Sequence, residues 1–370
     1  MRLVLIFLGC LTLSMATQDY FDNHACSECH EKIYEEYQHS AHAKSYFNDE
    51  LHRKIAKVAE PNTYSCARCH MPMADNLDDL ISGKAKPDKH NTTHTDAISC
   101  YFCHTIAYVK KSHAFNINTS ARQAKDYKPT LYGGLENPDS SDKHSSSKSP
   151  IYDKMVCTGC HSHKLNDNNV TIFRGMKEGE DSKACIKCHM PKLSGGAEKM
   201  DKRARGKHRS HKFLGIYDKD FRATGVDINI TTTNEGFDLK LTNKMGHALI
   251  VQPARVKYLK LMVKRDNQIV WKNFQKHPSE DKALYFEYRY QDKEGKKIII
   301  PANATHGEST NLDANKTKTV HYKVALKKGD IIQASMYVRF AKEDCQAVVS
   351  LKDELFKKEF ILKEVQHKVE

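Results

Sequence analysis

Five short repeats limit what this 370-residue chain can fold into more than any other feature. Ten of its 12 cysteines form five pairs with two residues between the partners, and a histidine directly follows every pair. The five C-x-x-C-H segments occupy residues 26–30, 66–70, 100–104, 157–161 and 185–189. With 21 histidines in the whole chain, five such successors do not arise by chance. The repeats therefore predict five copies of one chemical site.

The residue types and their spacing are those of covalent haem attachment. Two thiols add across the two vinyl groups of one porphyrin, and the adjacent histidine reaches the iron. A zinc site has no need of a histidine after every pair, and a disulfide scaffold needs no fixed two-residue gap. We therefore expect five c-type haems. Their attachment cysteines are Cys26, Cys29, Cys66, Cys69, Cys100, Cys103, Cys157, Cys160, Cys185 and Cys188, and their proximal iron ligands are His30, His70, His104, His161 and His189.

The second axial ligand of each iron decides what such a protein can do. A haem with two protein ligands passes electrons, whereas one with an open face can bind and transform a small molecule. Sixteen histidines remain as candidates for five distal positions, and several of them lie close to the motifs. His113, His163 and His247 are three of these candidates. Cys345 is left without a motif, and we expect it to be a buried thiol in a strand-like region.

The chain divides into two parts of different character. Residues 17–215 hold all five motifs, with helical patterns at 28–37 and 48–59 and an exposed loop at 133–150 that separates three motifs from two. Residues 216–370 hold no motif and show short alternating segments typical of an antiparallel β-sandwich, here predicted to be immunoglobulin-like. The expected strands are Val226–Thr233, 237–242, 256–264, 268–274, 297–300, 319–326, 331–340 and 359–365. The last of these could instead be a helix. The predicted fold class is multidomain α + β.

The first 16 residues have the pattern of a secretory signal peptide. A charged start is followed by an apolar run over residues 3–13, and small residues precede a cut after Ala16. A lipid anchor at Cys10 and a buried first helix are the alternatives. No apolar run reaches about 18 residues, so we expect no transmembrane segment. The sequence predicts an exported, periplasmic protein.

Composition narrows the classes of partner. The formal net charge is +13, and residues 199–212 alone carry seven Lys or Arg side chains. Such a run is compatible with nucleic-acid binding, but export and haem favour pairing with propionates or docking of a redox partner. The lean hydrophobic content of 39% fits a domain packed around macrocycles.

Several segments resemble the multihaem cytochromes of the cytochrome c-552/c-554 group. The first motif with the later Ser40-Ala41-His42-Ala43, residues 97–100 before the third motif, and Cys-His-Met-Pro after the second and fifth carry the resemblance. By position it implies that His42, His94 and His211 are distal ligands. Gly246-His247, Arg255 and residues 337–340 resemble a β-domain that follows the haems in some relatives, although the Pro-Thr-Gly expected after Gly-His is replaced here.

The resemblance implies periplasmic electron transfer in bacterial nitrogen or sulfur respiration. The leading hypothesis is an electron carrier that serves redox partner proteins, either quinol-linked or other cytochromes. The alternative is a reductase or oxidase of a small nitrogen or sulfur compound at one five-coordinate haem. No motif singles out a catalytic residue, so the sequence leaves enzymatic activity open.

Overall fold

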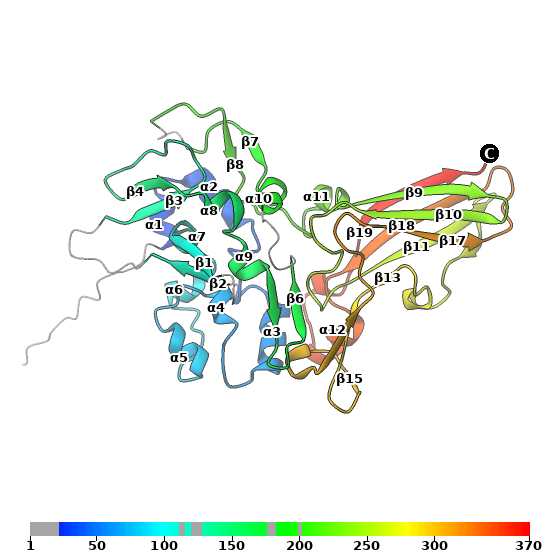
Figure 1. Ribbon diagram of the computed structural model, residues 1–370, viewed down its shortest axis with the longest axis horizontal. Helices are drawn as coiled ribbons and strands as arrows, with labels where there is room; N and C mark the ends of the chain where they lie inside the picture. Colours follow the sequence, from blue (N-terminus) through cyan, green and yellow to red (C-terminus); the bar gives the residue numbers. More distant parts are fainter. Residues whose placement is uncertain (1–21, 111–114, 120–127, 176–182, 199–201) are drawn as a thin grey trace, which may run out of the picture.

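The computed structural model describes residues 22–110, 115–119, 128–175, 183–198 and 202–370. Figure 1 shows two parts side by side, an N-terminal half of short helices and hairpins and an elongated β half. The signal-peptide region with Cys10, and the candidate ligand His113, lie outside the described residues. No helix within the described ranges is both long enough and apolar enough to cross a membrane. The mixed α + β fold class is confirmed.

The N-terminal half consists of elements only one to three turns or a few residues long. Its helices are α1 (Asn23–Ser27), α2 (Glu31–Gln38), α3 (Glu50–Ala59), α4 (Ala67–His70), α5 (Leu77–Ser82), α6 (Thr92–Thr95), α7 (Cys100–His104), α8 (Ile151–Lys154), α9 (Thr158–His161) and α10 (Lys183–His189). Its strand pairs are β1 (Ile106–Lys110) with β2 (Phe115–Asn118), β3 (Thr130–Gly133) with β4 (Ser145–Lys148), β5 (His163–Leu165) with β6 (Thr171–Arg174), and β7 (Lys192–Ser194) with β8 (Lys207–Arg209).

Local side-chain chemistry explains where several of these helices begin. Asp49 precedes α3 and its carboxylate accepts the backbone N–H of His52, while the hydroxyl of Ser99 accepts that of Phe102 at the start of α7. Such caps satisfy backbone donors that have no partner within the helix. The helices predicted at 28–37 and 48–59 are present as α2 and α3. The loop predicted at 133–150 contains β4, which pairs in parallel with β3.

The β half is built from three antiparallel sheets within the described residues. One has the order β17–β10–β9, a second has the order β12–β11–β18–β19 with β13 beside β11, and a third has the order β15–β14–β16. The elements are α11 (Lys219–Ala223), β9 (Val226–Thr233), β10 (Gly236–Asn243), β11 (Val256–Arg265), β12 (Gln268–Lys272), β13 (Tyr285–Phe286), β14 (Tyr288–Gln291), β15 (Lys297–Ile298), β16 (His306–Ser309), β17 (Thr317–Lys323), β18 (Ile331–Arg339), α12 (Glu343–Val349) and β19 (Glu359–Lys368). All eight predicted strands occur, and the last segment is a strand, not a helix. Cys345 is buried as expected, but it lies in α12.

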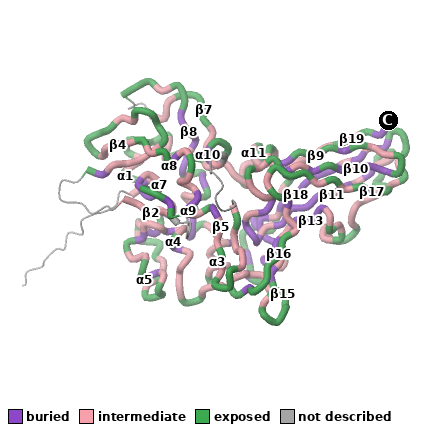
Figure 2. Tube along the Cα trace, in the orientation of Figure 1, coloured by how far each residue is buried: buried purple, intermediate pink, exposed green. Residues whose placement is uncertain are grey.

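Alternation along the strands produces the core of the β half. Leu239 and Leu241 of β10 face Leu259 and Leu261 of β11 within one buried cluster, because successive strand residues point to opposite faces. Figure 2 shows buried segments running along these strands, whereas those of the N-terminal half are scattered.

Helix α3 connects the two halves. Leu51 is 2% exposed and belongs to the buried cluster of the β half, with Ile55 packed against the same cluster. The Glu50 carboxylate accepts the backbone N–H groups of Lys352 and Asp353 just after α12, and α3 and α12 lie side by side (Figure 1). A helix from the first part of the chain is thus anchored in the second.

Candidate haem sites

Each C-x-x-C-H segment forms a turn of helix. The backbone N–H of His30 donates to the carbonyl of Cys26 at 3.0 Å, and the equivalent bonds in the second and fourth motifs measure 3.1 and 2.9 Å. Residues three and four positions apart on a helical turn lie on the same face. The turn therefore projects both thiols and the histidine of one motif to one side. None of the 11 cysteines among the described residues forms a disulfide.

Each of the five motif histidines lies opposite one further histidine. The pairs and the separations of their ring centroids are His30 with His144 at 6.2 Å, His70 with His52 at 5.4 Å, His104 with His211 at 6.3 Å, His161 with His42 at 5.9 Å, and His189 with His247 at 6.5 Å. A metal–nitrogen bond of about 2 Å places the centres of two imidazoles on opposite sides of one iron roughly 6 Å apart. The residues present therefore fit one haem iron between the members of each pair.

Hydrogen bonds fix the orientation of most of these rings. In six of them the Nδ1 atom contacts a backbone carbonyl or a hydroxyl, which leaves Nε2 for a metal. The contacts are His70 with Ser45 Oγ, His104 with the Tyr132 carbonyl, His144 with the Ser145 carbonyl, His189 with the Leu214 carbonyl, His211 with the Arg209 carbonyl and His247 with the Ala248 carbonyl. Partners of this kind are the usual second shell of a metal-bound histidine, since they set its tautomer and orientation.

The surrounding protein disfavours the charged form of five of these rings. Burial lowers the pKa of His42 to about 3, and it lowers the pKa of His70, His161, His211 and His247 to about 4. The ring of His161 keeps accessible surface, yet the surrounding protein is dense enough to disfavour its charged form. An iron ligand must be the neutral imidazole, and a pKa this far below 7 supplies it at neutral pH.

Some of the predicted distal histidines face a motif histidine in the structure, and others do not. His42, His211 and His247 each face a motif histidine. His94 is buried among polar partners, where Nδ1 accepts the backbone N–H of Asp88 at 2.9 Å and Nε2 lies 2.8 Å from Asn76 Oδ1. His163 lies in β5 opposite Arg174.

Two paired histidines escaped the sequence reasoning. His52 lies on α3, and His144 lies in the segment interpreted as a separating loop. His144 directly precedes β4, which pairs with β3, and its ring faces that of His30, far away in the sequence. Nothing in the residues adjacent to His144 predicts this position. For His52 the only indication in the sequence was its position within the helix predicted at residues 48–59.

The five pairs form one connected group. The thiols of Cys26 and Cys100 are hydrogen-bonded, and so are those of Cys69 and Cys160. Cys157 interacts electrostatically with Cys185 and with Cys103, and His161 interacts in the same way with His189. The fourth motif therefore lies next to the second, third and fifth, while the first lies next to the third.

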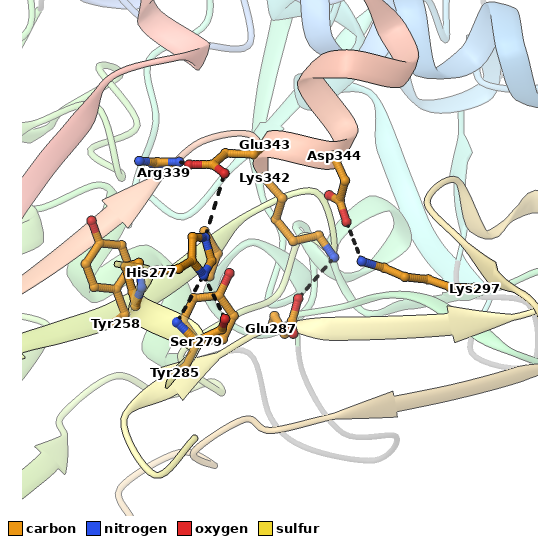
Figure 3. A pocket seen from close by; sticks show the side chains of 12 residues that line it. Tyr258, His277, Ser279, Tyr285, Glu287, Lys297, Arg339, Lys342, Glu343 and Asp344 are labelled. Carbon is orange, nitrogen blue, oxygen red and sulfur yellow. Dashed lines mark hydrogen bonds and ion pairs between the residues drawn. The ribbon is translucent and has the colours of Figure 1, made fainter. Parts of the chain in front are cut away.

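A separate cavity of about 270 Å³ lies in the β half, away from the motif histidines (Figure 3). Its charged side chains are paired with one another. Lys297 lies 2.8 Å from Asp344, and Arg339 forms ion pairs with Glu343 and Glu359. His277 on its wall contacts Ser279. The cavity contains no motif residue, and its charges are already balanced.

Comparison with known proteins finds a similarity in sequence over part of the chain and a similarity in fold over most of it. Residues 25–105 match the family described as cytochrome c554 and c-prime. The fold is similar to the crystal structure of a penta-heme cytochrome c552 from Thermochromatium tepidum, with a TM-score of 0.77 and 20% sequence identity. The match covers 95% of this chain and 99% of that one. No curated protein matches the sequence.

Proposed function

We propose that the chain, as a multihaem c-type cytochrome of the cytochrome c552/c554 family, is an electron carrier. It would carry electrons through five covalently attached haems, each held between two histidines. The cysteines of the five C-x-x-C-H motifs would attach the haems, and the motif histidines would bind the irons on one side. Haem supplies reversible one-electron chemistry at its iron. The protein would work after export to the periplasm, in nitrogen or sulfur respiration, between quinol-linked or cytochrome partners.

The observation that carries this proposal is the complete pairing of the motif histidines. All five have a second histidine at a separation that suits one iron. The distal ligands would be His144, His52, His211, His42 and His247 for the first to fifth motifs in turn. His94 takes no part in this assignment, because its ring faces no motif histidine among the described residues and instead binds Asp88 and Asn76. Two protein ligands on every iron favour electron transfer over chemistry at an open metal.

The contacts between motifs suggest the route. The first motif is connected to the third, and the third to the fourth, which also adjoins the second and the fifth. The second and fifth would form branches toward the β half, where Gln252 contacts His52 and His247 faces His189.

Intact mass and electron paramagnetic resonance test the proposal. We expect five additions of about 0.6 kDa, one at each C-x-x-C-H motif, and only low-spin ferric signals from the oxidised protein. Fewer additions would reject the count of five. A stoichiometric high-spin signal would reject two-histidine ligation at one or more irons.

One observation favours the alternative of a small-molecule reductase or oxidase, and it concerns His52. This side chain is 36% exposed, and both ring nitrogens have protein partners, with Nδ1 bound to Asp49 and Nε2 lying 2.9 Å from Gln252 Nε2. Those partners can hold the ring away from an iron. Carbon monoxide added to the reduced protein tests this. Binding of one equivalent that His52→Met abolishes or alters would support an open coordination position on the iron of the second motif. If no carbon monoxide binds, the reductase or oxidase alternative is rejected and electron transfer remains.

A further inference from the structure

The row of core side chains on β11 begins with one cation, and a second cation directly precedes the strand. Leu259, Leu261 and Val263 fill the core on this face and are at most 1% exposed. Because side chains alternate along a strand, Lys257 continues the same row toward the N-terminal half, and Arg255 lies just before the first residue of the strand. Lys257 is 4% exposed. The row therefore changes from aliphatic to cationic where the β half meets the motif histidines.

Neither cation has an anionic partner within the described part of the chain. Lys257 Nζ donates to the Leu249 carbonyl at 2.6 Å, which engages one of its three protons. The Nε atom of Arg255 is buried and makes no hydrogen bond. No ion pair joins either side chain to a carboxylate of the described residues. A buried charge without a counter-charge is costly, because the lost hydration is not replaced.

Both cations lie near the fifth histidine pair. The charges of Lys257 and Arg255 act on the ring of His247, which faces His189. The carbonyl that binds Lys257 belongs to Leu249, two residues after His247. Burial and the charge of Arg255 also lower the pKa of Lys257, as expected for two cations that repel each other. An anion between or beside them would remove this penalty.

We propose that Arg255 and Lys257 form a carboxylate-binding site for the propionates of the haem attached to Cys185 and Cys188. The inference rests on the proposed function and deepens it, because it gives the β half a role in setting the potential of one iron. Arg recognises a carboxylate through paired donors, and a buried Lys contributes a compact charge. Fixed positive charge stabilises the reduced, more negative state of the site, so it raises the reduction potential.

The test compares Lys257→Met and Arg255→Met with a matched control, Lys264→Met. Lys264 lies on the opposite face of the same strand and takes part in no core row. Potentiometric titration at pH 6, followed by electron paramagnetic resonance, would resolve the five low-spin signals. The fifth iron is identified as the one whose signal changes in His247→Met. We expect its midpoint potential to fall in both variants and to stay unchanged in the control.

Intact mass and far-UV circular dichroism accompany the titration, so that loss of haem or of folding is recognised. Five haems with an unchanged fifth potential in both variants would overturn the inference while leaving the proposed function intact. An equal shift in Lys264→Met would also overturn it, because any lysine of the strand would then suffice. Fewer than five haems in the unmodified protein would instead reject the proposed function.

A second arm distinguishes a propionate from a free anion of the same chemistry. The fifth potential of the unmodified protein is measured in chloride and then in phosphate or nitrite at constant ionic strength. A covalently attached propionate predicts no dependence on the identity of the anion. A dependence that disappears in Lys257→Met would show a free oxyanion at the site and would overturn the propionate assignment.

Discussion

His144 shows how a single residue acquires a role that its neighbours in sequence do not suggest. It directly precedes β4, and its ring centroid lies 6.2 Å from that of His30, 114 positions earlier in the chain. His94 shows the reverse, since its position before the third motif suggested a ligand, yet it binds Asn76 and Asp88. For a histidine, the partners of its two ring nitrogens are more informative than its distance from a motif.

Replacing His144 tests this at the residue scale. His144→Ala should convert one of five low-spin haems to a high-spin form, because the ring facing His30 would lose its counterpart. The absorption and electron paramagnetic resonance spectra would report the change. His39→Ala is the matched control, as this exposed ring contacts only the carbonyl of Glu35 in its own helix. Identical spectra for the two variants would remove His144 from the ligand assignment.

At the scale of elements, helix α3 and the turn before β18 are each fixed in place by contacts with distant residues. Helix α3 carries His52 and inserts Leu51 into the core of the β half. In the turn before β18, the Asp330 carboxylate accepts two bonds from Arg265 and the backbone N–H of Lys327. Both elements depend on partners far away in the sequence, and so their importance was not visible in local patterns.

Leu51→Ala should lower the free energy of unfolding by about 2–5 kcal/mol, the usual cost of removing a buried leucine side chain. It should also alter the spectrum of the haem proposed to lie between His52 and His70, because the helix that carries His52 would lose its anchor. Val58→Ala is the control on the same helix, since Val58 is 51% exposed, and we expect a change within about 0.5 kcal/mol. Equal effects in the two variants would contradict the anchoring role of α3.

The turn at Asp330 makes a pH-dependent contribution to stability. The hydrogen bonds from Arg265 hold the pKa of Asp330 below its ordinary value. A carboxylate with a depressed pKa stabilises the fold above its unfolded pKa, and this contribution is lost as the pH falls through the folded value. Denaturant unfolding from pH 6 down to pH 2 should therefore show a steeper acid loss in the unmodified protein than in Asp330→Asn. Asp266→Asn, in the neighbouring exposed turn, should retain the full acid loss.

The whole molecule is held together by contacts that cross the two halves. Glu50 binds the backbone after α12, Leu51 fills the β core, and Gln252 contacts His52. His247, from the loop between β10 and β11, faces His189. The β half therefore does more than support the N-terminal half, because it supplies His247 to one histidine pair and contacts His52 of another.

Thermal unfolding should consequently be a single transition for both halves. Absorption of the haems reports on the N-terminal half, and far-UV circular dichroism is dominated by the sandwich. We expect the two signals to change at the same temperature, which is the standard test of cooperative unfolding. A sandwich that melts separately while the haem absorption is unchanged would show that the crossing contacts are weak.

The repeated C-x-x-C-H segments by themselves predict the cofactor chemistry, the attachment cysteines and the proximal histidines, because each of these predictions depends on residues within one helical turn. Alternation of apolar residues likewise predicted the strands of the β half, since that pattern is local too. Only the tertiary structure decided which distant histidine faces each motif. Those pairings join segments separated by up to 119 positions, as in His42 and His161, and depend on strand pairing and core packing that no local pattern encodes.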